Sequence, residues 1–284
     1  MVDTAMTAIP AIGMTFVIIM GGIDVSVGAI LGLSVTILGL SYNSLPSVLV
    51  ATAAGLMAGL IMGVINGLTI AYLNIPPIIT TLGFLSIWSA AIYLFLGGNW
   101  LTNIPSNYTQ ILVMNKVLGL PTAIWAALIL IALFSWISAR RPWGRYVYAI
   151  GNNRQAARVQ GIPVRLTMIL AYSLLGLLSA CAGIVNLAIS PLVQSTTGSG
   201  FELSVIAAVV VGGTDIVGGR GTVYGSFLGA LLVEIIDDAV ILLHIQAFWQ
   251  GVATGLIILV AVVSGIIVRR KTDRATVRAL ASEG

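Results

Sequence analysis

Charge is scarce in this chain of 284 residues, of which only 8% are Asp, Glu, Lys or Arg. A soluble domain carries about 25% charged residues. Hydrophobic residues make up 58% of the chain, and its mean hydropathy is +1.08. A water-soluble fold of this length cannot bury so much apolar surface, so the composition predicts that the solvent is a lipid bilayer.

Histidine, cysteine and lysine are almost absent. His244 is the only histidine and Cys181 the only cysteine, which excludes a disulfide framework, a cysteine metal site and a paired-histidine metal site. Neither of the two lysines follows a glycine, so the chain has no P-loop with which to bind ATP. Ser199 is the most tempting nucleophile, but Thr197 stands where a Gly-x-Ser-Gly pattern needs glycine. The sequence therefore predicts neither an enzyme nor a cofactor.

Apolar segments fill most of the chain. Glycine and proline break them, as in Gly21-Gly22, Pro76-Pro77 and the turn from Gly218 to Gly221. The sequence predicts an all-α polytopic membrane protein with nine transmembrane or half-membrane helices in residues 1–268, followed by a tail, 269–284. The predicted helices are roughly 6–22, 25–41, 47–73, 77–97, 119–139, 166–190, 203–217, 222–243 and 247–268.

Positive charge is concentrated between residues 140 and 165, which hold six arginines. If this loop is cytoplasmic, threading the segments places 12 of the 13 basic residues inside, the exception being Lys116. The net charge of +4 is then explained by membrane orientation, and no nucleic-acid partner is predicted. The same threading puts the C-terminus inside and the N-terminus outside, which predicts that a preceding span is missing.

A short helix is predicted inside this loop, at about 151–161. Residues 153–160 lack glycine and proline, Asn152 or Asn153 can cap the start, and Gly161 can end the helix. Such an amphipathic helix can lie on anionic lipid or dock a soluble partner.

Acidic residues inside a membrane are costly and are therefore candidates for function. Asp24 lies at a break between two segments, where it can cap the next helix or contact a substrate. Glu234, Asp237 and Asp238 share one span, and Glu234 and Asp238 lie on one face of it. Asp237 and Asp238 fall near the external end of the span, either at a solvated interface or on a path. Asn66 is a further polar residue that can line a path.

Glycines repeat every four residues in two series, one from Gly55 to Gly67 and one from Gly221 to Gly229. Small residues at this spacing let helices approach closely in lipid, so both series predict packing seams in a compact bundle.

Several motifs together resemble ribose-type ABC transporter permeases. They are Gly-Gly-Ile-Asp-Val-Ser-Val-Gly at 21–28, Ile-Pro-Pro-Ile-Ile-Thr-Thr-Leu-Gly at 75–83, Gly-Arg with Tyr-Ala-Ile-Gly-Asn-Asn and Ala-Ala-Arg between 144 and 158, and the glycine-rich stretch 206–222. The resemblance implies the membrane subunit of an importer in the bacterial inner membrane. Its partners would be a cytoplasmic ATPase, a second permease copy or homologue, and a periplasmic sugar-binding protein.

The resemblance also implies which residues meet the ATPase. These candidates are Arg145, Gly151, Asn152, Asn153, Arg154, Ala157, Arg158, Gly161, Gly219 and Arg220. The path candidates remain Asp24, Asn66, Glu234, Asp237 and Asp238.

Two departures from the family pattern bear on substrate and topology. The family usually has about ten spans, and its first one is the span expected to be missing here. Asp237-Asp238 replaces an Asn-Asn pair that is common in the family. The sequence near residues 97–100 and 244–249 resembles the autoinducer-2 and rhamnose branches of the family. Ribose, rhamnose and autoinducer-2 all stay open as substrates. An ion-coupled secondary transporter is the alternative function, although no convincing inverted repeat is found.

Overall fold

The computed structural model describes residues 1–243, 249, 251–252, 254–260 and 263. The predicted span 247–268 falls only partly within these residues, and His244 and the tail 269–284 lie outside them.

The described chain is almost entirely helical, which confirms the predicted all-α class. The helices are α1 (Val2–Ile19), α2 (Val27–Ser44), α3 (Val48–Leu73), α4 (Pro77–Leu96), α5 (Asn107–Thr109), the π-helix η1 (Gln110–Met114), α6 (Thr122–Arg140), α7 (Pro142–Asn152), α8 (Arg154–Val159), α9 (Val164–Ile189), α10 (Phe201–Val211) and α11 (Val223–Leu242). One antiparallel hairpin joins β1 (Lys116–Val117) to β2 (Leu120–Pro121). Among the described residues, α1, α2, α3, α4, α6 and α9 are long and apolar enough to cross a membrane.

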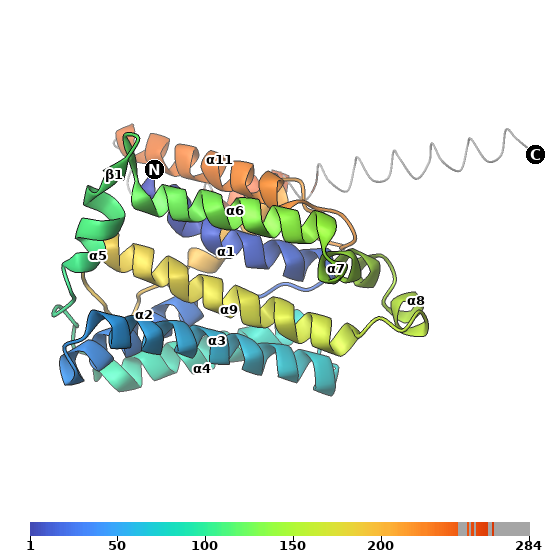
Figure 1. Ribbon diagram of the computed structural model, residues 1–284, viewed down its shortest axis with the longest axis horizontal. Helices are drawn as coiled ribbons and strands as arrows, with labels where there is room; N and C mark the ends of the chain where they lie inside the picture. Colours follow the sequence, from blue (N-terminus) through green and yellow to red (C-terminus); the bar gives the residue numbers. More distant parts are fainter. Residues whose placement is uncertain (244–248, 250, 253, 261–262, 264–284) are drawn as a thin grey trace, which may run out of the picture.

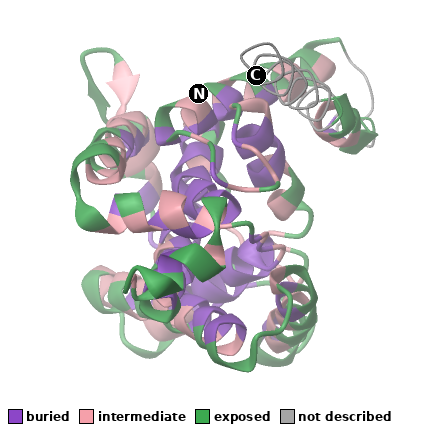
Figure 2. Ribbon diagram, turned by 90° about the vertical axis from the view of Figure 1, so that its right-hand side faces the viewer, coloured by how far each residue is buried: buried purple, intermediate pink, exposed green. Residues whose placement is uncertain are grey.

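The long helices lie side by side along the longest axis of the molecule (Figure 1). Helices α7 and α8 lie at one end, while β1, α5 and the N-terminus lie at the other. Helix α1 is the most enclosed span, with 83% of its apolar window buried. Viewed from the α7–α8 end, buried residues gather in the middle of the bundle and exposed residues form its rim (Figure 2). The rim therefore offers the apolar surface that lipid would cover.

Most of the glycine series of α3 packs against α9, so the predicted packing seam is confirmed. A Cβ on Gly59 would lie 2.6 Å from the Ala180 Cβ, and one on Gly63 would lie 3.0 Å from the Ser173 Cα. Gly55 instead faces α2. The backbones of α3 and α9 approach so closely at Gly59 and Gly63 that any larger side chain would force the two helices apart.

Helix α10 is shorter than predicted. It ends at Val211 rather than near residue 217, because Gly212 closes the helix and Gly213 takes a left-handed φ of +87°. Its 11 residues span about 16 Å, roughly half of the hydrocarbon core. Gly225 and Gly229 of α11 pack against its last turn, so the second glycine series is confirmed as a packing seam.

The segment that precedes α10 runs inward along α2. It is paired near one end of the bundle through the mutual backbone hydrogen bonds of Leu101 and Val193, at 2.9 and 3.0 Å. The backbones of Thr197 and Gly198 then lie against Gly32 and Gly28. Helix α10 therefore begins inside the bundle, beside the first turns of α2.

Candidate functional site

The predicted loop helix is divided in two by Asn153. Helix α7 ends at Asn152 and α8 begins at Arg154. Of the two predicted caps, Asn153 serves α8: its side-chain oxygen accepts from the backbone N–H groups of Gln155 and Ala156, both at 3.0 Å. Gly161, with φ of +78°, follows the helix as predicted. The sequence analysis missed α7, which starts at Pro142.

The docking candidates predicted on α8 differ in how far they are exposed. Ala157 is only 3% exposed and packs into the core, whereas Arg158 is exposed and Val159 is 89% exposed. Arg154 lies half-buried, with its Nη2 donating to the Met168 sulfur at 3.0 Å. Burial lowers the pKa of the Arg154 guanidinium below its usual range, and the positive charge of Arg158 lowers it further. Arg158 and Val159 therefore form the presented surface, while Ala157 and Arg154 hold the helix in place.

Two segments that were predicted to dock a partner meet at the end of α1. The Gly219 N–H donates to the Ile19 carbonyl at 2.8 Å, and the Gly151 backbone packs on the same carbonyl. A Cβ on Gly219 would lie 2.7 Å from the Asn152 Oδ1. Gly219 is buried, so this turn is a support for α7 and for the end of α1.

A second bond fixes α7 to the same turn. The Tyr148 hydroxyl donates to the Gly221 carbonyl at 2.8 Å. Arg145 and Arg220 are both exposed at this end. The surface around α8 is therefore basic, and a buried set of backbone contacts supports it.

Asp24 lies in a closed hydrogen-bond network with Asn66. Both side chains are 0% exposed. The Asp24 Oδ1 accepts from the Ser26 N–H at 2.8 Å and the Ser26 hydroxyl at 2.6 Å, while its Oδ2 accepts from the Asn66 Nδ2 at 3.1 Å. The same Asn66 nitrogen donates to the Ser26 hydroxyl oxygen at 2.8 Å. The carboxylate therefore ties the α1–α2 connection to α3, and it bonds Ser26 ahead of α2 rather than the first free N–H groups of that helix.

Two hydroxyl side chains that the sequence analysis missed complete this region. The Thr81 hydroxyl accepts from the Val25 N–H at 3.2 Å and lies 3.3 Å from the Ile23 carbonyl. The buried Tyr172 hydroxyl has no hydrogen-bond partner among the described residues, and it lies 2.5 Å from where a Cβ on Gly22 would be. The sequence offered only weak signals of them: Thr81 belongs to the 75–83 motif, and Tyr172 stands in an otherwise mostly apolar run.

The acids of α11 point in different directions. Glu234 turns toward α1, where its Oε1 accepts from the Thr7 hydroxyl at 2.5 Å. Asp237 is half-buried, and Asp238 is exposed. The five predicted path residues thus form two groups, Asp24 with Asn66 in the first and the α11 acids in the second.

Glu202 is a further acid that the sequence analysis missed. It occupies the first turn of α10, and its buried Oε2 has no hydrogen-bond partner within the described part of the chain. A Cβ on Gly28 would lie 2.5 Å from that oxygen. The predicted segment began at residue 203, so this acid was assigned to a loop although it lies where the half-helix begins.

These features define a polytopic membrane protein in which a broken connection and a half-helix enclose polar groups, as in many transporters. Comparison with known proteins identifies the family. A model of the branched-chain amino acid transport system permease component matches residues 1–262, and the chain belongs to this family. The chain is therefore a transport subunit of an ABC transporter family, as the motifs predicted.

The similar curated proteins are importer permeases. The Autoinducer 2 import system permease protein LsrC of Escherichia coli (strain K12 / DH10B) is 38% identical over 253 residues, which are 89% of this chain and 74% of that protein. LsrC of Salmonella paratyphi B (strain ATCC BAA-1250 / SPB7) is 39% identical over 249 residues, 88% of this chain and 72% of that protein. No solved structure matches the chain.

Proposed function

We propose that this chain is the membrane-spanning subunit of a bacterial inner-membrane importer that moves autoinducer-2 or a related monosaccharide, driven by a separate ATPase. The observation that carries the proposal is the 38% identity to LsrC over 89% of the chain. Ribose and rhamnose are the next substrates to test. Family membership does not favour the ion-coupled transporter.

In this proposal the α7–α8 end faces the cytoplasm. The six arginines between residues 140 and 165 lie there together with Arg220, whereas Lys116 lies in the hairpin at the opposite end. The positive-inside rule favours this orientation. A periplasmic binding protein would then deliver substrate at the end that carries the hairpin, and a second permease would complete the pore.

The ATPase docks on α8 in this arrangement. Val159 of α8 is 89% exposed, so burying it against a partner would contribute apolar contact area. Movement of α8 would pass to the Gly151 and Gly219 contacts on Ile19. The path would run past Glu202 and Glu234, whose carboxyl groups lie inside the bundle.

Reconstitution tests both the substrate and the docking. The permease, its ATPase and its binding protein are placed in liposomes, and ATP-dependent uptake of autoinducer-2, ribose and rhamnose is measured. Val159→Asp should reduce uptake and ATPase co-purification at least tenfold, because it puts an unpaired charge at an apolar contact. Val159→Leu is the matched control and should retain both. If all three compounds are taken up without ATP, the importer assignment is wrong; if Val159→Asp behaves as the Leu control, only the docking assignment fails.

A further inference from the structure

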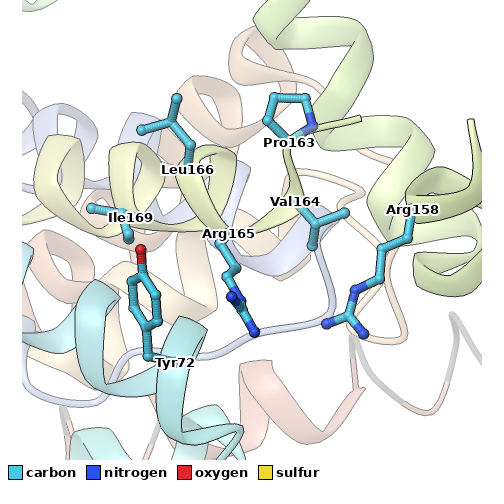
Figure 3. Close-up of a pocket in the computed structure, with 7 residues that line it drawn as sticks. All are labelled: Tyr72, Arg158, Pro163, Val164, Arg165, Leu166 and Ile169. Atoms are coloured by element: carbon cyan, nitrogen blue, oxygen red, sulfur yellow. The ribbon is translucent and has the colours of Figure 1, made fainter. Parts of the chain in front are cut away.

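A cavity of about 520 Å³ lies where the end of α3 meets the start of α9 and the end of α8. Its polar lining comes from Tyr72, Arg158 and Arg165, and its apolar lining includes Val164, Leu166 and Ile169. Figure 3 shows the Arg158 and Arg165 guanidinium groups on either side of Val164, with their ends turned to the same side. The cavity is large enough for a small headgroup and has two cationic groups at its edge.

No acid neutralises the two arginines within the part of the chain that the structure describes. Neither guanidinium forms an ion pair with a carboxylate anywhere in the described residues. Arg165 instead lies over the Tyr72 ring, 5.1 Å from the ring centroid, which fixes its direction without consuming its charge. Arg154 adds a third positive charge nearby, since Arg158 acts on it directly. Three like charges at one place are unfavourable unless an anion joins them.

The position of the cavity indicates where the anion comes from. Tyr72 is the next-to-last residue of α3, and Arg165 is the second residue of α9, so the cavity lies at the level where two spans leave the hydrocarbon. Tyrosine and arginine are typical of this interface. The adjoining turns of the same two helices, further from the helix ends, expose Leu68 and Leu170, at 42% and 46%. The charged groups at the helix ends match the headgroup of a phospholipid, and the exposed leucines deeper along the spans match its acyl chains.

We propose that this cavity binds the phosphate headgroup of an anionic phospholipid, with its acyl chains lying along the exposed leucines of α3 and α9. The phosphate is held between Arg158 and Arg165, and Tyr72 orients Arg165. The bound lipid joins α3, α8 and α9 at the end of the bundle where α8 is presented. The proposal does not depend on the substrate of the transporter.

Native mass spectrometry of the purified permease tests the proposal. The full chain is extracted into micelles that contain equal amounts of dioleoyl phosphatidylglycerol and dioleoyl phosphatidylcholine, and the retained lipids are counted. The wild-type protein should retain phosphatidylglycerol preferentially. Arg165→Gln should reduce that preference about fivefold, and Arg158→Gln with Arg165→Gln about thirtyfold, since each interfacial arginine contributes about fivefold to anionic-lipid affinity.

Arg141 provides the matched control. It also lies over an aromatic ring, 4.5 Å from the Trp136 centroid, but it does not line this cavity. Arg141→Gln should leave the preference unchanged, and Arg165→Lys should retain most of it. The melting temperature in the same micelles reports on folding. It should differ little between Arg141→Gln and Arg165→Gln, because both arginine side chains are exposed.

Four results would overturn the proposal. The first is equal retention of both lipids by the wild-type protein, and the second is an equal loss in Arg141→Gln and Arg165→Gln. The third concerns other occupants: displacement of phosphatidylglycerol by 10 mM inorganic phosphate would indicate a soluble-anion site. Weaker ATPase co-purification by Arg165→Gln with unchanged lipid retention would likewise indicate a protein-docking site instead.

Discussion

Asn66→Ala tests whether the buried network holds the α1–α2 connection to α3. The substitution removes the Asn66 amide, which among the described residues is the donor both to the Asp24 Oδ2 (3.1 Å) and to the Ser26 hydroxyl oxygen (2.8 Å). Both Asp24 and Asn66 are 0% exposed, so water does not replace the lost donor. Removing one partner of a buried polar pair costs about 1–3 kcal/mol, and Asp24 keeps its two bonds from Ser26. We expect unfolding to become easier by about that amount.

The assay is unfolding in mixed micelles with increasing denaturing detergent, combined with a double-mutant cycle. In Asp24→Ala the carboxylate acceptor is removed altogether, so the bond between the two residues is already lost. The double variant should therefore lose less stability than the sum of the single variants, by about 0.5–3 kcal/mol. Asn43→Ala removes the acceptor of an exposed pair with Asn103, joined at 2.7 Å, and should change stability by less than about 0.5 kcal/mol.

Additive single variants would refute this reasoning. A coupling below about 0.3 kcal/mol means that Asp24 and Asn66 do not stabilise one another. A loss in Asn66→Ala no larger than in Asn43→Ala would also refute it, because burial would then give the pair no advantage over an exposed one.

Three further results are expected. Gly63→Leu should lower the melting temperature strongly, since overpacking costs about 1–3 kcal/mol or more. Gly83→Leu should be tolerated, because nothing lies within 4 Å of a Cβ there. Equal melting temperatures in the two variants would contradict the packing seam. Asn153→Ala should cost about 1 kcal/mol of local α8 stability and reduce ATP-dependent uptake, while hydrogen exchange at α8 that stays unchanged would argue against the cap. Glu234→Gln keeps an acceptor for Thr7, so the fold should melt normally while uptake falls; normal uptake would remove Glu234 from the path.

Periodic and compositional signals predicted the fold well. The turns at Pro76-Pro77 and Gly97 place the bounds of α4 within one residue of the prediction, because proline and a left-handed glycine leave little choice of where a helix begins and ends. The helix bounds near Gly212 were wrong by six residues. After Val211 the chain reads Gly-Gly-Thr-Asp before Ile216 and Val217, so the glycine pair was a local stop signal that the prediction passed over.

The candidate site was less predictable, because sidedness within a short helix depends on packing. Ala157 and Val159 are both apolar and only two residues apart, yet one is 3% and the other 89% exposed. Local chemistry in the sequence restricts the cap of α8 to Asn152 or Asn153, but it does not tell which face of α8 meets α9. The buried carboxyl oxygen of Glu202 was missed for the same reason, since its burial comes from Gly28 in a distant helix.

The contacts at the Ile19 carbonyl explain why two glycine motifs far apart in sequence belong together. One carbonyl oxygen at the end of α1 accepts from the Gly219 N–H and packs on Gly151. Five residues further along the chain, Asp24 closes the network that holds α3. A side chain at Gly151 would separate α7 from α1, because its Cβ would clash with the Ile19 carbonyl, whereas Gly219 is favoured both by its left-handed φ of +81° and by its close contact with Asn152. Helix α8 and the α1–α2 connection are thus joined through a short, tightly packed stretch of backbone. A displacement of α8 at one end of the bundle would therefore reach the polar residues in its interior.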